Sequence, residues 1–245
     1  MNTLSRRKLI QAGVSTAAGA AGLAAAGHLA NRYGLIPPVT GRLYAAGEAL
    51  TYASQRLLTS HSMALEFPRS QISAKPYANG RPPVEEEFKR LQAGGFADWR
   101  VTLDGMVARP ATFSVADLKR FPSSSQITHL ACEEGWSFIA EWTGVPLVHV
   151  LNEAGVHPEA RYVVYSSIQS RWRQSVDMAD ALHPQTLLTY GMNGGDLPVG
   201  HGGPVRVRVP RQLGYKNVKF IRRLTVVRNL DEFPPRGAYS WYAGI

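Results

Sequence analysis

Short segments of β-strand pattern alternate along this chain with short helical segments, without a regular strand–helix–strand repeat. Residues 104–108 predict a tight hairpin, in which Asp104-Gly105 turns the chain and Met106–Ala108 returns along the first strand. The Ser114–Asp117 segment has the spacing of a capping box and predicts a short helix. We predict other strands at 99–103, 126–131, 161–166, 186–190, 204–210 and 218–227, and other helices at 43–57, 85–91, 146–153 and 178–181. This mixture predicts an α+β domain built on mixed sheets.

The predicted strand at 204–210 has two different faces, because successive side chains of a strand point in opposite directions. Its valines share one face, and Arg206 and Arg208 share the other. The surrounding stretch, residues 197–230, holds eight Lys or Arg and no acidic residue. Glycines before this strand and at Gly214 let the backbone approach a ligand, so the block suits a phosphate-bearing cofactor. The alternative is a solvated basic sheet face.

The N-terminal residues predict an export signal of the twin-arginine type. Arg6 and Arg7 precede an uncharged, Ala- and Gly-rich stretch, Leu9–Asn31, that is too weakly apolar for an ordinary membrane span. This indicates a periplasmic protein that is exported in the folded state. The alternative is that the signal is retained as a membrane anchor. An ordinary Ala-rich helix is the other interpretation. Nucleic acid is not an expected partner despite the net charge of +9, and zinc-finger and RRM signatures are absent.

Cys132 is the only cysteine of the chain, so an internal disulfide is impossible. Three fates remain: a buried inert thiol, a bond to another chain, or use as a metal ligand or nucleophile. A thiolate is a soft ligand suited to transition metals. The neighbouring Glu133 and Glu134 are adjacent in sequence and should point apart, which argues against a paired-carboxylate site.

The composition along the chain predicts three parts. Residues 1–31 form the signal or anchor, residues 32–95 an N-terminal helix and extended arm, and residues 96–245 the main domain. No dinucleotide-binding G-x-G-x-x-G motif and no Walker loop occurs in the sequence.

Several motifs in order give the chain a family resemblance. They are Phe96-Ala97-Asp98-Trp99, Cys132-Glu133-Glu134-Gly135-Trp136-Ser137, Glu141-Trp142-x-Gly144-Val145-Pro146-Leu147, His183-Pro184-Gln185-Thr186, Tyr190-Gly191-Met192-Asn193-Gly194, and Leu197-Pro198 through His201-Gly202-Gly203-Pro204-Val205-Arg206 to Gly214-Tyr215-Lys216. This set resembles the molybdopterin-dependent oxidoreductases of the sulfite oxidase superfamily. It is most similar to the periplasmic branch that contains the catalytic subunit of the protein-methionine-sulfoxide reductase.

The resemblance implies a molybdenum–molybdopterin cofactor whose metal takes one thiolate from the protein, at the position of Cys132. By motif position it also implies cofactor contacts from six other residues, namely Ser167, His201, Arg206, Asn217, Val218 and Lys219. The family's N-terminal contacts, an Asn and a Tyr-Glu pair, have no counterpart. The arm from Glu66 to Tyr77 is the expected source of substitutes.

The resemblance further implies oxygen-atom transfer to or from a small-molecule or protein sulfoxide. We expect a sulfite-oxidase-type fold without the C-terminal immunoglobulin-like dimerisation domain, and hence a monomer that exchanges electrons with a membrane haem or cytochrome partner. Arg171 or Arg173 could attract a polar substrate at the pocket mouth. Three alternatives stay open: a sulfite-oxidising enzyme, a cofactor-free binding protein and a cysteine hydrolase.

Overall fold

The computed structural model describes residues 21–30, 35, 45–59, 61–169 and 172–233. The chain divides into two compact units, residues 1–59 and 60–245, so the extended arm belongs to the same unit as the strands. In the first unit, residues 21–30 are helical and α2 (Ala45–Thr59) confirms the predicted amphipathic helix. No helix within the described ranges is long and apolar enough to cross a bilayer. The twin arginines lie outside these ranges, and the three-part division stays a prediction.

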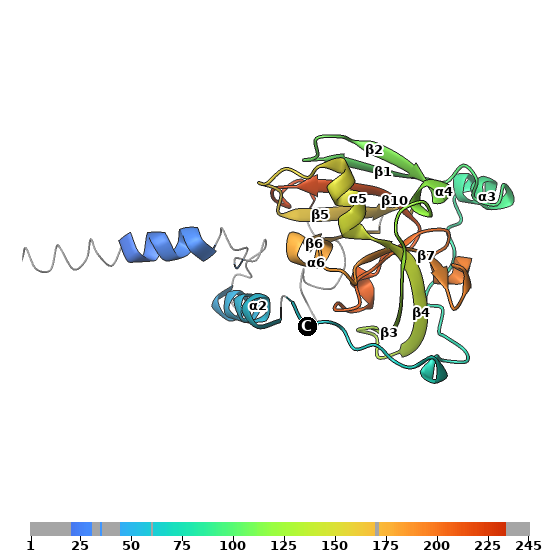
Figure 1. Ribbon diagram of the computed structural model, residues 1–245, viewed down its shortest axis with the longest axis horizontal. Helices are drawn as coiled ribbons and strands as arrows, with labels where there is room; N and C mark the ends of the chain where they lie inside the picture. Colours follow the sequence, from blue (N-terminus) through green and yellow to red (C-terminus); the bar gives the residue numbers. More distant parts are fainter. Residues whose placement is uncertain (1–20, 31–34, 36–44, 60, 170–171, 234–245) are drawn as a thin grey trace, which may run out of the picture. The chain divides into compact units, whose positions relative to one another are not determined.

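The second unit contains two five-stranded sheets, and the first has the order β2-β1-β10-β5-β6. Figure 1 shows these strands one below another in that order. Only the β1–β10 pair is parallel among the neighbours in this sheet. Its strands are β1 (Arg100–Gly105), β2 (Ala111–Ser114), β5 (Tyr162–Ser167), β6 (Arg173–Asp177) and β10 (Ile221–Val227).

The second sheet is antiparallel, with the order β3-β4-β7-β8, and β9 pairs with residues 187–189 of β7 on the edge opposite β4. Asn193 and Gly194 both have positive φ angles, 50° and 82°, and form the turn between β7 and β8. The strands of this sheet are β3 (Ser124–Ala131), β4 (Ser137–Pro146), β7 (Leu187–Met192), β8 (Gly195–Asp196) and β9 (Arg206–Arg208). The prediction of an α+β domain with mixed sheets is confirmed.

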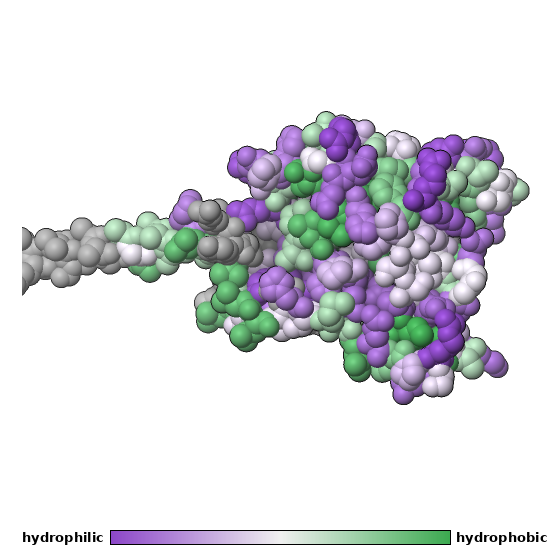
Figure 2. Space-filling model, in the orientation of Figure 1, coloured by the Kyte–Doolittle hydropathy of each residue, from purple (hydrophilic) through white to green (hydrophobic). Residues whose placement is uncertain are grey.

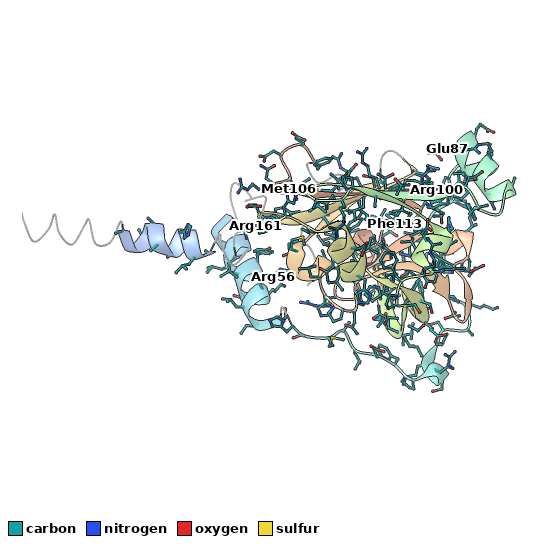
Figure 3. The ribbon with its side chains drawn as sticks, turned by 45° about the horizontal axis from the view of Figure 1, so that its top comes forward. Arg56, Glu87, Arg100, Met106, Phe113 and Arg161 are labelled. Carbon is teal, nitrogen blue, oxygen red and sulfur yellow. The ribbon has the colours of Figure 1, made fainter. Side chains whose placement is uncertain are left out.

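The predicted hairpin at residues 104–108 is wrong. The strand that returns along β1 is β2, five residues later, as the labels on Arg100, Met106 and Phe113 let the reader follow in Figure 3. Met106 instead donates its N–H to Val226 at 2.8 Å. The N–H groups of Ala108 and Arg109 donate to the carbonyls of Gly155 and Ala154. These carbonyls end a helix and lack partners within it, so they draw the segment away from β1.

The short helices lie close to the ranges that the sequence predicts for them. They are α3 (Glu86–Ala93), α4 (Val115–Leu118), α5 (Leu147–Ala154) and α6 (Met178–Ala181). Ser114 and Asp117 form the predicted capping box of α4. Gly155, at φ 68°, ends α5 in the left-handed conformation that glycine adopts readily. Glu87 of α3, labelled in Figure 3, accepts a hydrogen bond from Arg222 of β10 at 2.9 Å.

Two apolar clusters hold the second unit together, and β9 lies between them. The larger cluster packs β1, β5, β10 and α5 with Val205, Val207 and Val209. The smaller one contains Trp142, with residues of β3, β4 and β7. The arginine face of β9 points to Trp142, whereas its valine face enters the larger cluster. The face of the unit seen in Figure 2 mixes hydrophilic and hydrophobic side chains, as a folded surface normally does.

Gly144 allows β4 to approach β7 closely, and this contact can be tested. A Cβ at Gly144 would lie 2.3 Å from the carbonyl oxygen of Leu188, so Gly144→Ala must displace backbone. We expect a loss of roughly 2–3 kcal/mol in the free energy of unfolding, measured in urea. Gly195→Ala is the matched control, because its nearest contact would be 3.9 Å away. Equal urea midpoints for the two variants would contradict this account.

Candidate active site

One cavity of about 600 Å³ brings most of the predicted site residues together. Four parts of the second unit line it: the arm at 77–84, the β3–β4 hairpin at 130–138, the β5–β6 loop with the start of β6 (Gln169, Trp172 and Gln174), and residues 201–220. The lining therefore combines residues more than 100 positions apart in the sequence.

Cys132 lies in the cavity wall, at the tip of the β3–β4 hairpin. Its carbonyl accepts from Gly135 at 3.0 Å, and its N–H donates to Trp136 at 2.9 Å. Gly135 has a φ of 90°, which lets the chain turn back sharply. The predicted strand before Cys132 and the glycine after it thus place the thiol at a fixed point of the wall.

The Cys132 thiol is poorly suited to be a nucleophile. Burial raises its pKa to about 11, and the negative charges of Glu133 and Glu134 act in the same direction. A catalytic cysteine normally needs a lowered pKa, because the thiolate is the reactive form. This argues against the cysteine-hydrolase alternative. The two carboxylates point to different partners, as expected: Glu133 accepts from the Tyr215 N–H, and Glu134 from the Trp136 indole.

Gly214 brings the basic segment against the thiol. A Cβ at Gly214 would lie 3.3 Å from Cα, Cβ and Sγ of Cys132, a distance that few real side chains show. The residue opens the 3-10 turn Gly214–Lys216, which leads to Asn217. The approach of this turn to Cys132 connects two motifs that the sequence separates by about 80 residues.

Arg206 and Arg208 are buried, 3% and 0% exposed. Arg206 donates to the carbonyls of His201 at 2.8 Å and Asn217 at 2.6 Å. Arg208 donates to the Asn217 side-chain oxygen at 2.8 Å and to the His129 carbonyl at 2.6 Å. Both guanidinium groups also lie over the Trp142 ring, 5.2 and 5.4 Å from its centre. The alternative of a solvated basic face is wrong.

These two positive charges are stabilised without a carboxylate partner among the described residues. Burial lowers the pKa of Arg206 to about 9 and lowers that of Arg208 too, where the charge of Arg206 contributes. The Nε atoms of both arginines have no hydrogen-bond partner. A buried charge is costly unless it is paired, so the site is suited to an anionic group from a ligand.

Lys219 and His201 complete this positive end of the cavity. The Lys219 ammonium donates to the carbonyls of Asn79 and Gly200, each at 2.6 Å. Burial, followed by the charge of Arg206, lowers the pKa of Lys219 to about 7. Burial, followed by the charges of Arg206 and Lys219, lowers the pKa of His201 to about 4, so its imidazole is neutral at pH 7. An anion would favour the charged form of Lys219.

Six of the seven predicted site residues line the cavity, namely Cys132, His201, Arg206, Asn217, Val218 and Lys219. Ser167 is buried at the end of β5 but is not a lining residue, and its hydroxyl accepts from the Gln169 N–H at 3.2 Å. Arg173 does not line the cavity either, and its guanidinium lies over the Phe233 ring. Arg171 lies outside the described residues. The roles of all these residues stay predictions.

Sequence reasoning missed part of the wall. The arm contributes residues 77–84, and of the expected segment, Glu66 to Tyr77, only Tyr77 lines the cavity. Glu66 instead pairs with Thr128 as an isolated bridge. Asn79 is central, because its carbonyl accepts from Lys219 and its amide donates to Glu134 at 3.1 Å. No periodic pattern marks this arm in the sequence, so only its contacts identify it.

This arrangement of a thiol and uncompensated cationic groups in one cavity is suited to an anionic cofactor that also takes a sulfur ligand. The family model "oxidoreductase molybdopterin binding domain" matches residues 89–232. The chain belongs to this family and is a molybdopterin-binding oxidoreductase.

The chain is similar to subunits of protein-methionine-sulfoxide reductases. It is 33% identical to one named YedZ1 from Azospira oryzae, over 77% of this chain and 70% of the relative. It is 34% identical to the catalytic subunits MsrP of Ralstonia nicotianae and Xanthomonas axonopodis pv. citri, covering 58% and 55% of this chain. The chain spans about half the length of these two relatives, 46% in each case.

A solved structure supports the fold. The sulfane dehydrogenase SoxCD from Paracoccus pantotrophus superposes with a TM-score of 0.52 and is 29% identical, over 54% of this chain and 39% of that chain. The expectation of a sulfite-oxidase-type molybdopterin-binding fold is confirmed.

The residues present fit molybdopterin. Arg206, which is buried, and Lys219, which is partly buried, line the cavity and suit its phosphate, and the buried Arg206 Nε has no hydrogen-bond partner within the described structure. Cys132 offers a soft sulfur ligand in the same cavity. Across the described residues, no group of three or more His, Cys, Asp or Glu side chains forms a metal site.

Trp142 should be needed for the cationic end of the site. Trp142→Leu removes the ring beneath both guanidinium groups, so we expect a loss of about 3 kcal/mol in unfolding free energy and a lower pterin content. Trp142→Phe keeps an aromatic face and should retain more pterin. The measurement is pterin fluorescence per folded chain. Trp99→Leu, a buried tryptophan away from the cavity, controls for packing loss. Equal pterin contents in all three variants would disprove the role of Trp142.

Gly202 should be needed for the position of Lys219. Gly202 has a φ of 106°, and a Cβ there would lie 2.8 Å from Cβ and Cγ of Lys219. Gly202→Ala therefore adds backbone strain of roughly 1–2 kcal/mol and displaces Lys219, which should lower the pterin content of the purified protein. Gly200→Ala, whose Cβ would lie 3.4 Å from that of Ala78, should bind pterin nearly as the wild type does. Unchanged pterin content in Gly202→Ala would refute this expectation.

Proposed function

We propose that this protein is an exported mononuclear molybdenum oxidoreductase that reduces sulfoxides by oxygen-atom transfer. The observation that carries the proposal is the presence, in one cavity, of the buried Cys132 thiol and of cationic groups that no carboxylate neutralises in the described structure. The similarity to methionine-sulfoxide reductase subunits supports the reaction.

The proposed roles follow the two ends of the cavity. Cys132 would hold molybdenum as a thiolate ligand. The phosphate end of the cofactor is held by Arg206 and Lys219, with contacts from His201, Asn217, Val218 and, by the family resemblance, Ser167. Trp142 and the carbonyl oxygens around Arg206 keep the guanidinium group in place. Metal binding would also lower the pKa of the Cys132 thiol.

The reaction is balanced as one sulfoxide, two electrons and two protons giving one thioether and one water. When bound, the molybdenum cofactor supplies the two-electron oxo-transfer chemistry. The protein binds the substrate and restricts water. Trp136 and Phe138 stack with ring centres 6.2 Å apart in the wall beside Cys132, and they make this part of the cavity apolar. An apolar wall suits the thioether product and the alkyl groups of the sulfoxide.

Electrons and export require further partners. We propose a membrane haem protein as the electron donor, because the relatives are named as subunits of reductase systems and the chain carries no C-x-x-C-H haem motif. The twin arginines Arg6 and Arg7 support export of the folded protein to the periplasm, where the signal is cleaved or kept as an anchor. The protein is proposed to be a monomer apart from this partner.

Oxidation of a sulfite-like anion is the second candidate. It is supported by the structural similarity to a sulfane dehydrogenase and by the cationic cavity. The mouth of the cavity favours sulfoxide reduction, because Tyr77, Val84 and Trp172 expose apolar and aromatic surface there. A small inorganic anion has no apolar groups to bury against such a surface.

Metal analysis and paired assays test the proposal. Protein expressed with ample molybdate should contain about one molybdenum per chain. It should reduce methionine sulfoxide with reduced viologen dye faster than it oxidises sulfite with an electron acceptor. Cys132→Ser should keep pterin but lose turnover to background, because a hydroxyl is a poor soft-metal ligand. Arg206→Met, by contrast, should lose the pterin itself.

The contrary outcomes separate the alternatives. Stoichiometric zinc or no metal would disprove the molybdenum site. Faster turnover of sulfite would favour the second candidate. Biological function that is unchanged in Cys132→Ser would favour a cofactor-free binding protein.

A further inference from the structure

Arg81 stands out among the charged side chains that line the cavity. Glu133 accepts from the Tyr215 N–H and Glu134 from the Asn79 and Trp136 side chains. Arg206 and Lys219 donate to backbone carbonyls. Arg81 is exposed in the arm that forms one wall, and within the described structure its guanidinium has neither a hydrogen bond nor an ion pair.

The same mouth exposes large apolar side chains. Tyr77 is 54% exposed, Val84 76% and Trp172 49%, and all three line the cavity with Arg81. The Tyr77 ring packs against Trp136 with ring centres 5.2 Å apart, so it is held in place although half of its surface faces solvent. Gathered exposed apolar groups mark interaction sites, and tyrosine, tryptophan and arginine are the residue types that contribute most to binding energy.

The chemistry of this mouth selects one kind of occupant. The aromatic and aliphatic surface suits the side chains and backbone of an extended polypeptide. The Arg81 guanidinium can bind a carboxylate through two parallel hydrogen bonds. Glu133 and Glu134, the acidic lining residues, are already hydrogen-bonded on the Cys132 side of the cavity. Among the lining residues that the structure describes, Arg81 is the exposed cation that a substrate carboxylate at the rim can reach.

We propose that Arg81 is a specificity-determining residue that selects polypeptides in which methionine sulfoxide is flanked by aspartate or glutamate. This inference rests on the proposed sulfoxide reduction. Arg81 binds the flanking carboxylate at the rim, whereas the sulfoxide enters the cavity toward Cys132. The contact acts in substrate binding, so it changes KM and leaves kcat nearly unchanged.

The test uses the molybdenum-loaded full chain and blocked peptides, N-acetylated and C-amidated, with the core Asp-Met(O) or Asn-Met(O). Blocking the ends distinguishes a side-chain carboxylate from the α-carboxylate of free methionine sulfoxide. With reduced viologen as donor at low salt, the wild type should prefer the Asp peptide about threefold in kcat/KM, as an exposed ion pair allows. The preference should decrease at high salt because the charges are screened.

Variants assign the preference to one side chain. Arg81→Gln should abolish the charge preference through KM, and Arg81→Glu should invert it. Lys75→Gln is the matched control, since Lys75 is an exposed cation of the same arm that does not line the cavity. It should keep the wild-type preference.

Several results would overturn the inference. An Asp preference retained in Arg81→Gln, lost equally in Lys75→Gln, or expressed in kcat would refute the role of Arg81, while sulfoxide turnover itself would leave the proposed function intact. Turnover of free methionine sulfoxide but of neither peptide would refute the polypeptide substrate. No reduction of any sulfoxide by fully loaded protein would overturn the proposed function and this inference together.

Discussion

The burial of two arginines on one short strand is the constraint on which the site depends. A guanidinium group inside a protein is costly unless its donors and its charge are satisfied. Here carbonyl and amide oxygens accept from both terminal nitrogens of Arg206 and of Arg208, and the Trp142 ring lies against both charges. None of these partners carries a negative charge. The positive field is therefore preserved for a ligand, and the valine face of β9, packed in the larger core, keeps the strand in place.

Close backbone contacts connect this cationic end to the thiol end. Gly214 lies against Cys132, and Gly202 lies against Lys219, at distances where a larger residue would displace its neighbour. Asn79 joins the arm to both ends, because its carbonyl accepts from Lys219 and its amide donates to Glu134 next to the Cys132 turn. The cavity thus has the dimensions of a cofactor site because several segments approach one another at fixed points, and a change in one of them affects the others.

The α-helices and several turns were predictable from the sequence. The capping box at Ser114, the glycine that ends α5 and the Asn193-Gly194 turn each act within a few residues, so local pattern is enough to identify them. The prediction of a hairpin directly after β1 was wrong for the opposite reason. Asp104-Gly105 has the composition of a tight turn, but hydrogen bonds from the following segment to β10 and to the end of α5 are long-range, and they decide the path. Strands β2, β4, β6 and β8 were also missed.

The sequence by itself determined the family, the α+β class and most of the residues of the site, because ordered motifs and the alternation along β9 survive without knowledge of contacts. Only the tertiary structure decided that Arg206 and Arg208 are buried and not solvated, that Ser167 does not line the cavity, and that residues 77–84 complete its wall. The physical reason is that burial and the electrostatic environment of a charge are set by segments distant in the chain. A local pattern gives the direction of a side chain but not what covers it.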